Sequence, residues 1–200
     1  AAEESIRRIV EELPEVLVVG DSVSSSYTAG VGEAREGVAN VWGPPANCRS
    51  VRQSLDEIEI YIGDRDWDLI HFNWGIHDVT LVDGRGRRSK EGEPQVPIGE
   101  YREKLERLVR RLKATGAGLI WASTTPVAED VAVRQNGNIT AYNEAAAEIM
   151  QRHHVQTDDL HGAVKGWDEP SWEDGVHFNA QGAKRLARKV AGVVRERLDR

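Results

Sequence analysis

Two short motifs near opposite ends of the chain contain the residue types of a serine nucleophile, a general base and an orienting acid. The first is Gly-Asp-Ser at 20–22, directly after the apolar run at 16–19, and the second is Asp-Gly-Val-His at 174–177. A serine hydroxyl is a weak nucleophile at neutral pH, so it needs a histidine to accept its proton and a carboxylate to orient that histidine. We therefore predict a catalytic triad of Ser22, His177 and Asp174.

Each motif alone also has an ordinary structural explanation. A serine that follows a strand is often the N-cap of the next helix, and Asp-x-x-His also occurs in surface turns. The three-residue spacing nevertheless allows Asp174 to reach Nδ1 of His177, which leaves Nε2 to face Ser22. A helix expected from residue 180 onward would hold the histidine in a fixed position.

Alternating strands and helices are expected to bring the two motifs together. Short apolar runs predict buried strands, and the periodic segments between them predict helices. The strands are expected at 16–19, 38–42, 69–73, 119–123 and 154–157, and the helices at 3–13, 51–61, 98–115, 139–152 and 180–198. This order predicts an α/β fold, a three-layer α/β/α sandwich with a central parallel sheet and its site at the carboxyl ends of the strands.

Length, charge and cysteine content narrow the class of protein. The 200 residues, of which 40% are hydrophobic, fit one globular domain over residues 1–200. The net charge of −7 comes from intermixed acidic and basic residues, which argues against binding of nucleic acid. The single cysteine, Cys48, excludes an intrachain disulfide framework and a cysteine-rich zinc site. None of these features indicates an oligomeric state.

The sequence also bears on location. No apolar run approaches the roughly 20 residues of a membrane helix, and the N-terminal segment is acidic and amphipathic, unlike a signal peptide. We expect a soluble protein with no membrane insertion. Because the chain begins at Ala1 without methionine, removal of a leader and a secreted or periplasmic location stay open beside a cytoplasmic one.

The motifs resemble those of the SGNH, or GDSL-type, hydrolases, a family defined by four short blocks spread over the domain. Gly-Asp-Ser at 20–22 matches the first block, and Asp174 with His177 matches the last, in residue type and in order. The resemblance implies a flavodoxin-like α/β/α fold and an acyl-enzyme mechanism without a metal or organic cofactor. It also implies ester substrates, among them O-acetylated carbohydrates, short acyl esters, lysophospholipids and thioesters.

The third block departs from the family pattern. Gly-Ile-His-Asp at 75–78 stands where the family has Gly-x-Asn-Asp, so His77 replaces the asparagine that donates to the oxyanion. An imidazole N–H can make the same hydrogen bond when the ring has the required tautomer. The wider segment 67–78 resembles a branch of the family in which histidine is usual at this place.

The second block departs as well. The block that offers a glycine amide corresponds best to 47–50, with Arg49 at the glycine position and Gly43 as the competing candidate. Because the donor is a backbone N–H, a side chain is tolerable there if φ permits. The resemblance thus implies an oxyanion hole of the Ser22 amide, the Arg49 amide and the His77 side chain.

Several residues near the motifs are candidates for substrate binding: Asn47, Trp74, Asp78 and Thr124. Tryptophans at 42, 74, 167 and 172 could form a stacking platform for a sugar ring or an acyl group, although aromatic residues near strand ends are just as often core. The segment 82–97 is longer than a routine connection and could cover the site. Its basic residues could attract an anionic substrate or could be merely solvated: Arg85, Arg87, Arg88 and Lys90.

The leading hypothesis is a serine esterase that acts on a small-molecule or glycan ester, with acetyl esters of carbohydrates favoured because no apolar lid helix is present. Two alternatives stay open. A metal-dependent phosphoesterase would need ligands that converge from the motifs: Asp21, His77, Asp78, Asp174 and His177. A non-catalytic glycan-binding relative is suggested by the departures at His77 and Arg49.

Overall fold

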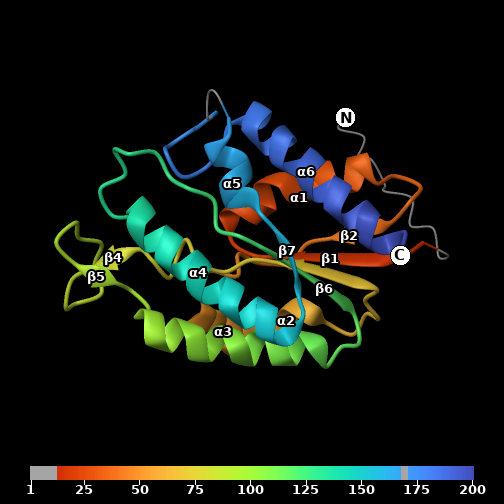
Figure 1. Cartoon of the computed structure of the whole chain (residues 1–200), viewed down its shortest axis with the longest axis horizontal. Helices are drawn as coiled ribbons and strands as arrows, with labels where there is room; N and C mark the ends of the chain where they lie inside the picture. The colour runs from red at the N-terminus through yellow and green to blue at the C-terminus, as the bar shows by residue number, and fades with distance from the viewer. Residues whose placement is uncertain (1–12, 168–170) are drawn as a thin grey trace, which may run out of the picture.

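The computed structural model describes residues 13–167 and 171–200, so the helix expected at 3–13 falls almost entirely outside the described residues. Within these ranges, one parallel sheet of five strands forms the centre of the protein (Figure 1). Every neighbouring pair in this sheet is parallel. The strand order is β2 (Asn40–Trp42), β1 (Glu15–Val19), β3 (Leu69–Phe72), β6 (Gly118–Ala122) and β7 (Gln156–Asp158).

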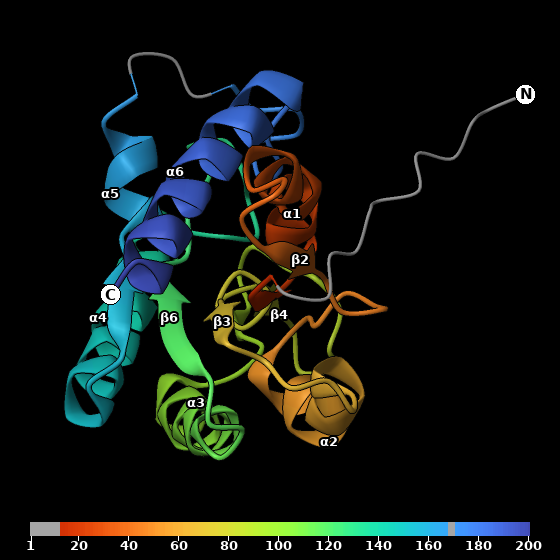
Figure 2. The ribbon, with the colours of Figure 1, turned by 90° about the vertical axis from the view of Figure 1, so that its right-hand side faces the viewer.

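Helices cover both faces of the sheet, as the turned view shows (Figure 2). One layer contains α1 (Ser22–Ala34), α5 (Leu160–Lys165) and α6 (Ala180–Leu198). The opposite layer contains α2 (Val51–Ile62), α3 (Ile98–Lys113) and α4 (Asn136–His153). The predicted α/β/α sandwich with a central parallel sheet is therefore confirmed.

The side chains of β1 show how the sheet separates two cores. Val16 and Val18 belong to the apolar cluster with α1 and α6, whereas Leu17 and Val19 belong to the cluster with α2 and α3. Successive side chains of a strand point to opposite faces, and here both faces are covered. This double burial explains why the strands appear in the sequence as continuous apolar runs.

Two helices and a two-stranded hairpin are not among the residue ranges predicted from the sequence. Helix α1 follows the Gly-Asp-Ser motif, and its buried positions Val23, Tyr27 and Val31 form only a narrow stripe in a serine-rich segment. The short α5 was not expected. The segment at 82–97 contains an antiparallel hairpin of β4 (Leu81–Val82) and β5 (Glu93–Pro94) in place of an irregular loop.

No helix in the described ranges combines the length and the apolar character that crossing a bilayer requires.

Candidate active site

The structure places Ser22, His177 and Asp174 in a hydrogen-bonded row. Oγ of Ser22 lies 2.8 Å from Nε2 of His177, and Nδ1 of His177 lies 2.7 Å from Oδ2 of Asp174. Ser22 is the first residue of α1, just beyond the carboxyl end of β1, and His177 lies three residues before α6. Because α1 packs against α6, the two motifs meet at one edge of the sheet.

Asp174 holds its own loop as well as the histidine ring. Its Oδ1 accepts the backbone N–H groups of Val176 and His177, at 2.9 and 2.7 Å. Gly175 has a φ of 81°, a left-handed conformation that lets this turn close within three residues. The backbone N–H of His177 and then its ring lower the pKa of Asp174 to about 2, so this carboxylate is ionised at neutral pH.

Asp21 determines how α1 begins. Its Oδ1 accepts the backbone N–H of Val23 at 2.9 Å, which makes Asp21 the N-cap of the helix. Burial raises the pKa of Asp21 to about 6. As the first residue after this cap, Ser22 presents one of the N–H groups that a helix leaves without an intrahelical partner.

His77 lies in the turn after β3, with its side chain partly buried. Burial, together with the positive charges of Arg134, Arg88 and Arg49, lowers the pKa of His77 to about 4. The imidazole is therefore neutral at neutral pH and has one N–H to donate. Neither ring nitrogen makes a hydrogen bond to a described residue, so no protein group fixes the tautomer.

Arg49 adopts the backbone conformation of a glycine. Its φ of 47° lies in the left-handed region, which is unusual for a side chain as large as arginine. Gly43, the competing candidate for the glycine position, has no positive φ. However, the backbone N–H of Arg49 already donates to Oδ1 of Asn47 at 2.9 Å, so the predicted oxyanion donor is occupied in this structure.

Three of the four residues predicted to bind substrate are buried in this structure. Trp74 and Asp78 are 0% exposed and Thr124 is 3% exposed, so their role in substrate binding stays a prediction. The chain turns back into the layer of α2 and α3 after β3, and Oδ1 of the Asp78 side chain accepts the N–H of Val51 at the start of α2. Asn47 is partly exposed, and its side chain closes the turn at Arg49.

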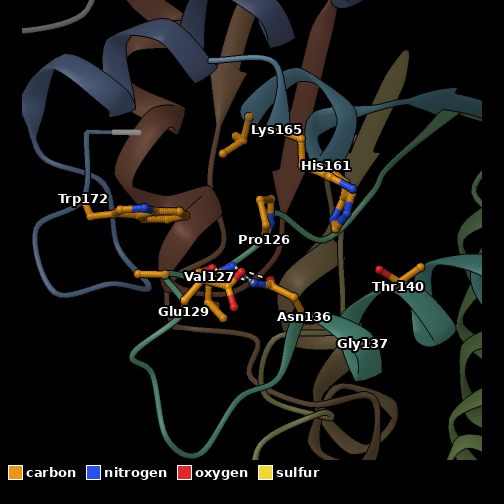
Figure 3. A pocket seen from close by; sticks show the side chains of 11 residues that line it. Pro126, Val127, Glu129, Asn136, Gly137, Thr140, His161, Lys165 and Trp172 are labelled. Atoms are coloured by element: carbon orange, nitrogen blue, oxygen red, sulfur yellow. Dashed lines mark hydrogen bonds between the residues drawn. The ribbon is translucent and has the colours of Figure 1, made fainter. Parts of the chain in front are cut away.

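A groove of about 400 Å³ lies beside the triad loop (Figure 3). Trp172 lies at one end of this groove, and His161 and Thr140 lie at the other. The Trp172 ring stacks on Phe178, the neighbour of His177, with centroids 4.4 Å apart. The wall of the groove contacts the triad loop, because the backbone N–H of Ala128 in that wall donates to the carbonyl of Gly175 at 2.8 Å.

The tryptophans therefore differ in their roles. Trp42 lies under the guanidinium of Arg65 and Trp167 under that of Arg185, at 4.0 and 3.9 Å from the ring centroids. Trp74 is core. Of these four tryptophans, Trp172 alone lines the groove, so a platform of several exposed rings is not formed by the described residues.

Sequence reasoning missed Arg134. This residue lies in an irregular segment between β6 and α4, is only 9% exposed, and donates from Nε to the carbonyl oxygen of Ile76 at 3.1 Å. It thereby contacts the turn that positions His77. No motif marks Arg134 in the sequence, because a tertiary contact brings its segment to the site: the N–H of Leu81 donates to the carbonyl of Val133.

The alternative of a metal-dependent phosphoesterase required a convergent ligand set. Over residues 13–167 and 171–200, His, Cys, Asp and Glu side chains form no group of three or more that could hold a metal ion. The imidazole of His177 is instead hydrogen-bonded to the Asp174 carboxylate through Nδ1 and to the Ser22 hydroxyl through Nε2.

The geometry at Ser22 agrees with a comparison to known protein families. The family model of the GDSL-like lipase/acylhydrolase family matches residues 18–185. The chain belongs to this family. The matched residues begin in β1 and end in α6. They therefore include Ser22, Asp174 and His177.

Individual relatives of this GDSL-like chain are esterases and lipases by name. A curated relative, the GDSL esterase/lipase CPRD49 of Arabidopsis thaliana, is 27% identical over 120 residues, which are 52% of this chain and 46% of that protein. The match thus spans about half the length of that relative.

Solved structures share the fold at low sequence identity. The acetyl xylan esterase AlAXEase superposes with a TM-score of 0.72 at 16% identity, covering 90% of this chain and 99% of its own. A lipase/acylhydrolase from Enterococcus faecalis gives 0.72 at 18%, covering 92% and 97%. The acetylxylan esterase Axe2 from Geobacillus stearothermophilus gives 0.69 at 19%, covering 88% and 92%.

Proposed function

We propose that this protein is a serine esterase that hydrolyses acyl esters, and acetyl esters of carbohydrates in particular, through an acyl-enzyme intermediate. The observation that carries the proposal is the 2.8 Å approach of Ser22 Oγ to His177 Nε2, in a row with the 2.7 Å contact of His177 to Asp174. These distances are within reach of the proton transfers that acyl transfer requires.

Acylation begins at Ser22. Its Oγ attacks the ester carbonyl carbon while Nε2 of His177 accepts the hydroxyl proton. Asp174, ionised because its pKa is about 2, stabilises the resulting imidazolium through Nδ1. When the tetrahedral intermediate collapses, His177 gives the proton to the leaving alcohol, and the acyl group stays on Ser22.

Deacylation reverses these roles with water as the nucleophile. His177 takes a proton from water as the water oxygen attacks the acyl carbonyl carbon. Collapse of the second tetrahedral intermediate breaks the bond to Ser22, and the proton on His177 returns to Ser22 Oγ. The products are a carboxylic acid and the regenerated hydroxyl.

Two donors are proposed for the oxyanion: the backbone N–H of Ser22 and the neutral ring of His77. A single donor of this kind contributes about 3 kcal/mol to stabilisation of the transition state. The N–H of Arg49 can serve as a third donor once it exchanges Oδ1 of Asn47 for the oxyanion. Asn47 thus acts on the oxyanion hole through Arg49.

The groove of Figure 3 supports a carbohydrate as the alcohol part of the ester. One ring face of a sugar can stack on Trp172, and hydroxyl groups can reach the polar side chains of Asn136 and Thr140. The similarity in fold to enzymes named acetyl xylan esterases supports the same substrate class.

Labelling and turnover together test this proposal. A fluorophosphonate should modify the wild-type protein stoichiometrically at Ser22, and the protein should release 4-nitrophenol from 4-nitrophenyl acetate. The variant Ser22→Ala should fold, resist labelling and lose turnover. A wild-type protein that binds acetylated oligosaccharides but shows neither labelling nor turnover would establish a glycan-binding relative in place of an esterase.

A further inference from the structure

His161 lines the groove of Figure 3 and has no part in the mechanism proposed above. It is the second residue of α5, and its backbone N–H donates to Oγ of Ser123 at 2.8 Å. The Ser123 hydroxyl in turn donates to Oδ1 of Asp159 at 2.9 Å, and Asp159 is the N-cap of the helix. Since Ser123 directly follows β6, these bonds fix the backbone of His161 relative to the carboxyl end of that strand.

The imidazole ring of His161 is held through one of its two nitrogens. Nδ1 lies 3.0 Å from the carbonyl oxygen of Thr124, and because a carbonyl oxygen can only accept, Nδ1 carries the proton in this contact. Nδ2 of Asn143 donates to the same oxygen at 2.9 Å and lies 3.3 Å from Nδ1, as two donors to one acceptor do. Oδ1 of Asn143 accepts the N–H of Thr124 at 2.8 Å, which fixes the orientation of that amide. The protein therefore sets both the tautomer and the direction of the ring.

Nε2 of His161 is left as a hydrogen-bond acceptor. A neutral imidazole that is protonated on Nδ1 has a lone pair on Nε2. This nitrogen has no hydrogen-bond partner within residues 13–167 and 171–200, and it is not one of the buried side-chain atoms without a partner. It is therefore accessible from outside the protein. Since the residue lines the groove, the groove contains an acceptor that the protein holds in one orientation.

Other polar side chains of the groove differ from His161 in this respect. Oδ1 of Asn136 accepts the N–H of Val127 at 3.0 Å, and its Nδ2 donates to the Val127 carbonyl at 2.9 Å and to Glu129 at 3.1 Å. Both N–H groups of the Asn136 amide are thus engaged. Thr140 is exposed, and its hydroxyl has no hydrogen bond to any part of the chain that the structure describes. His161 combines a fixed orientation with an unused polar atom.

The remaining lining favours a neutral carbohydrate over an ionic ligand. Glu129 and Lys165 contribute charges of opposite sign to the groove. Trp172 lies at one end and His161 at the other (Figure 3). A sugar has an apolar ring face that packs on an aromatic side chain, and it has hydroxyl groups that donate hydrogen bonds. The volume of about 400 Å³ is within the range of sites for small molecules.

We propose that His161 is a specificity-determining residue that selects esters of neutral carbohydrates. A sugar hydroxyl donates to Nε2 of His161 while a ring face of the carbohydrate stacks on Trp172. This inference rests on the proposed esterase function, which supplies the ester and its alcohol part. It assigns to His161 a contact with the substrate, remote from the bond that is cleaved, and no proton transfer.

Two substitutions at His161 separate its two nitrogens. Asparagine keeps an amide N–H close to the place of Nδ1 and has no atom at the place of Nε2, whereas glutamine puts its amide near the place of Nε2. We compare kcat/KM for an acetylated xylooligosaccharide with kcat/KM for 4-nitrophenyl acetate. His161→Asn should lower this ratio roughly fivefold, mainly through a higher KM for the oligosaccharide, and His161→Gln should restore part of it.

The order of the two variants distinguishes substrate contact from a structural role. If His161 only anchored α5 to Thr124, then His161→Gln, which loses the Nδ1 donor, would have the lower ratio. That order, or a wild-type ratio in His161→Asn, would overturn the proposal.

His154→Asn is the matched control for His161→Asn. His154 is the C-cap of α4 and has a φ of 55°, a left-handed conformation that asparagine tolerates. The groove lies at the other end of this helix of 18 residues, about 27 Å away. His154→Asn should keep the wild-type ratio. An equal fall of the ratio in both asparagine variants would contradict a specific contact at His161.

Substrates that lack single hydroxyl groups test the hydrogen bond itself. In a complete set of monodeoxy analogues of the acetylated oligosaccharide, one analogue should have a kcat/KM roughly fivefold lower with the wild-type protein. The same analogue should cause little further loss in His161→Asn, because the partner of that hydroxyl is already absent. Losses that are additive for every analogue in the set would contradict the proposed bond.

A binding measurement separates failure of this inference from failure of the esterase proposal. Calorimetry with an unacetylated xylooligosaccharide compares the Ser22→Ala protein with a protein that has both Ser22→Ala and His161→Asn. Affinity that falls roughly fivefold in the second protein supports the role of His161 even if no ester is cleaved. If a fluorophosphonate labels Ser22 of the wild type but the oligosaccharide does not bind, or binds both proteins equally, the role of His161 is overturned and the esterase stays intact.

Discussion

Ser22 Oγ and His177 Nε2 are 2.8 Å apart although 155 positions separate the two residues in the chain. The reason lies in the helices that start beside them. Helix α1 begins at Ser22, α6 begins three residues after His177, and the two helices pack against each other. The distance between nucleophile and base therefore depends on how closely α1 and α6 approach.

Gly30 controls that approach. A Cβ at this position would lie 2.8 Å from the Cβ of Ala187 in α6, so Gly30→Ala should force the helices apart. We expect a loss of about 1–3 kcal/mol in the free energy of unfolding, despite the better helix propensity of alanine. Turnover should also fall, since Ser22 and His177 separate. Urea unfolding and kcat/KM on 4-nitrophenyl acetate measure both effects.

Gly192 supplies the matched control for Gly30. It lies in α6, and a methyl group added there would meet no atom within 4 Å, so Gly192→Ala should stabilise the protein by about 0.5–1 kcal/mol. Equal stabilisation by both alanine variants would show that α1 and α6 are not in close contact at Gly30.

The side chain of His77 is expected to donate one hydrogen bond to the oxyanion. His77→Ala should lower kcat about a hundredfold, which corresponds to loss of one donor. His77→Asn should keep a large part of the activity, because an amide N–H can replace the imidazole N–H. A folded but inactive His77→Asn protein would instead show that the histidine transfers a proton.

His77 should also make stability depend on pH. Its pKa is about 4 in the folded protein, mainly because of burial, and about 6.5 in an unfolded chain. The unfolded state therefore binds the proton first as the pH falls, and the free energy of unfolding decreases between pH 6.5 and 4. Relative to His77→Asn, the wild type should lose about 1–2 kcal/mol between pH 7 and pH 5 in urea unfolding. An unchanged difference between the two proteins would contradict the lowered pKa.

Titration of Asp78 should make the free energy of unfolding decrease as the pH rises, whereas titration of His77 makes it decrease as the pH falls. Burial raises its pKa to about 8, so the folded state holds a proton that the unfolded state releases near pH 4. Stability should fall as the pH rises from 4 through 8. Asp78→Asn removes the buried charge and keeps an oxygen to accept the N–H of Val51, so its Tm should exceed that of the wild type at pH 9. A Tm lowered equally at pH 5 and pH 9 would contradict this explanation.

The sheet could be predicted from the sequence because its strands are buried on both faces. Residues 16–19 and 69–72 are apolar or buried at every position, and such runs are visible without any knowledge of partners. Helix α6 was also predictable, since its apolar residues recur at helical spacing. The extent of helix α1 was not, because serine side chains occupy most of its first turns and its buried stripe is narrow.

The triad and the surrounding site differ in how far the sequence determines them. Asp174 and His177 are joined by a local turn, so their contact follows from spacing. Trp74 and Thr124 follow strand ends as substrate-binding residues would, but the direction in which the chain turns there depends on packing against α2 and α4. Arg134 reaches the site through a tertiary contact, and nothing in its own segment indicates that position.

The proposed acyl-enzyme mechanism is tested by identifying the residue that carries the acyl group during turnover. The protein is mixed rapidly with excess 4-nitrophenyl acetate, quenched in acid and digested, and the peptides are analysed by mass spectrometry. We expect acetylation of Ser22 that disappears in Ser22→Ala and accumulates as fast as the first 4-nitrophenol is released. Turnover with full rate in Ser22→Ala, or with the acetyl group on another residue, would contradict the role of Ser22 as nucleophile.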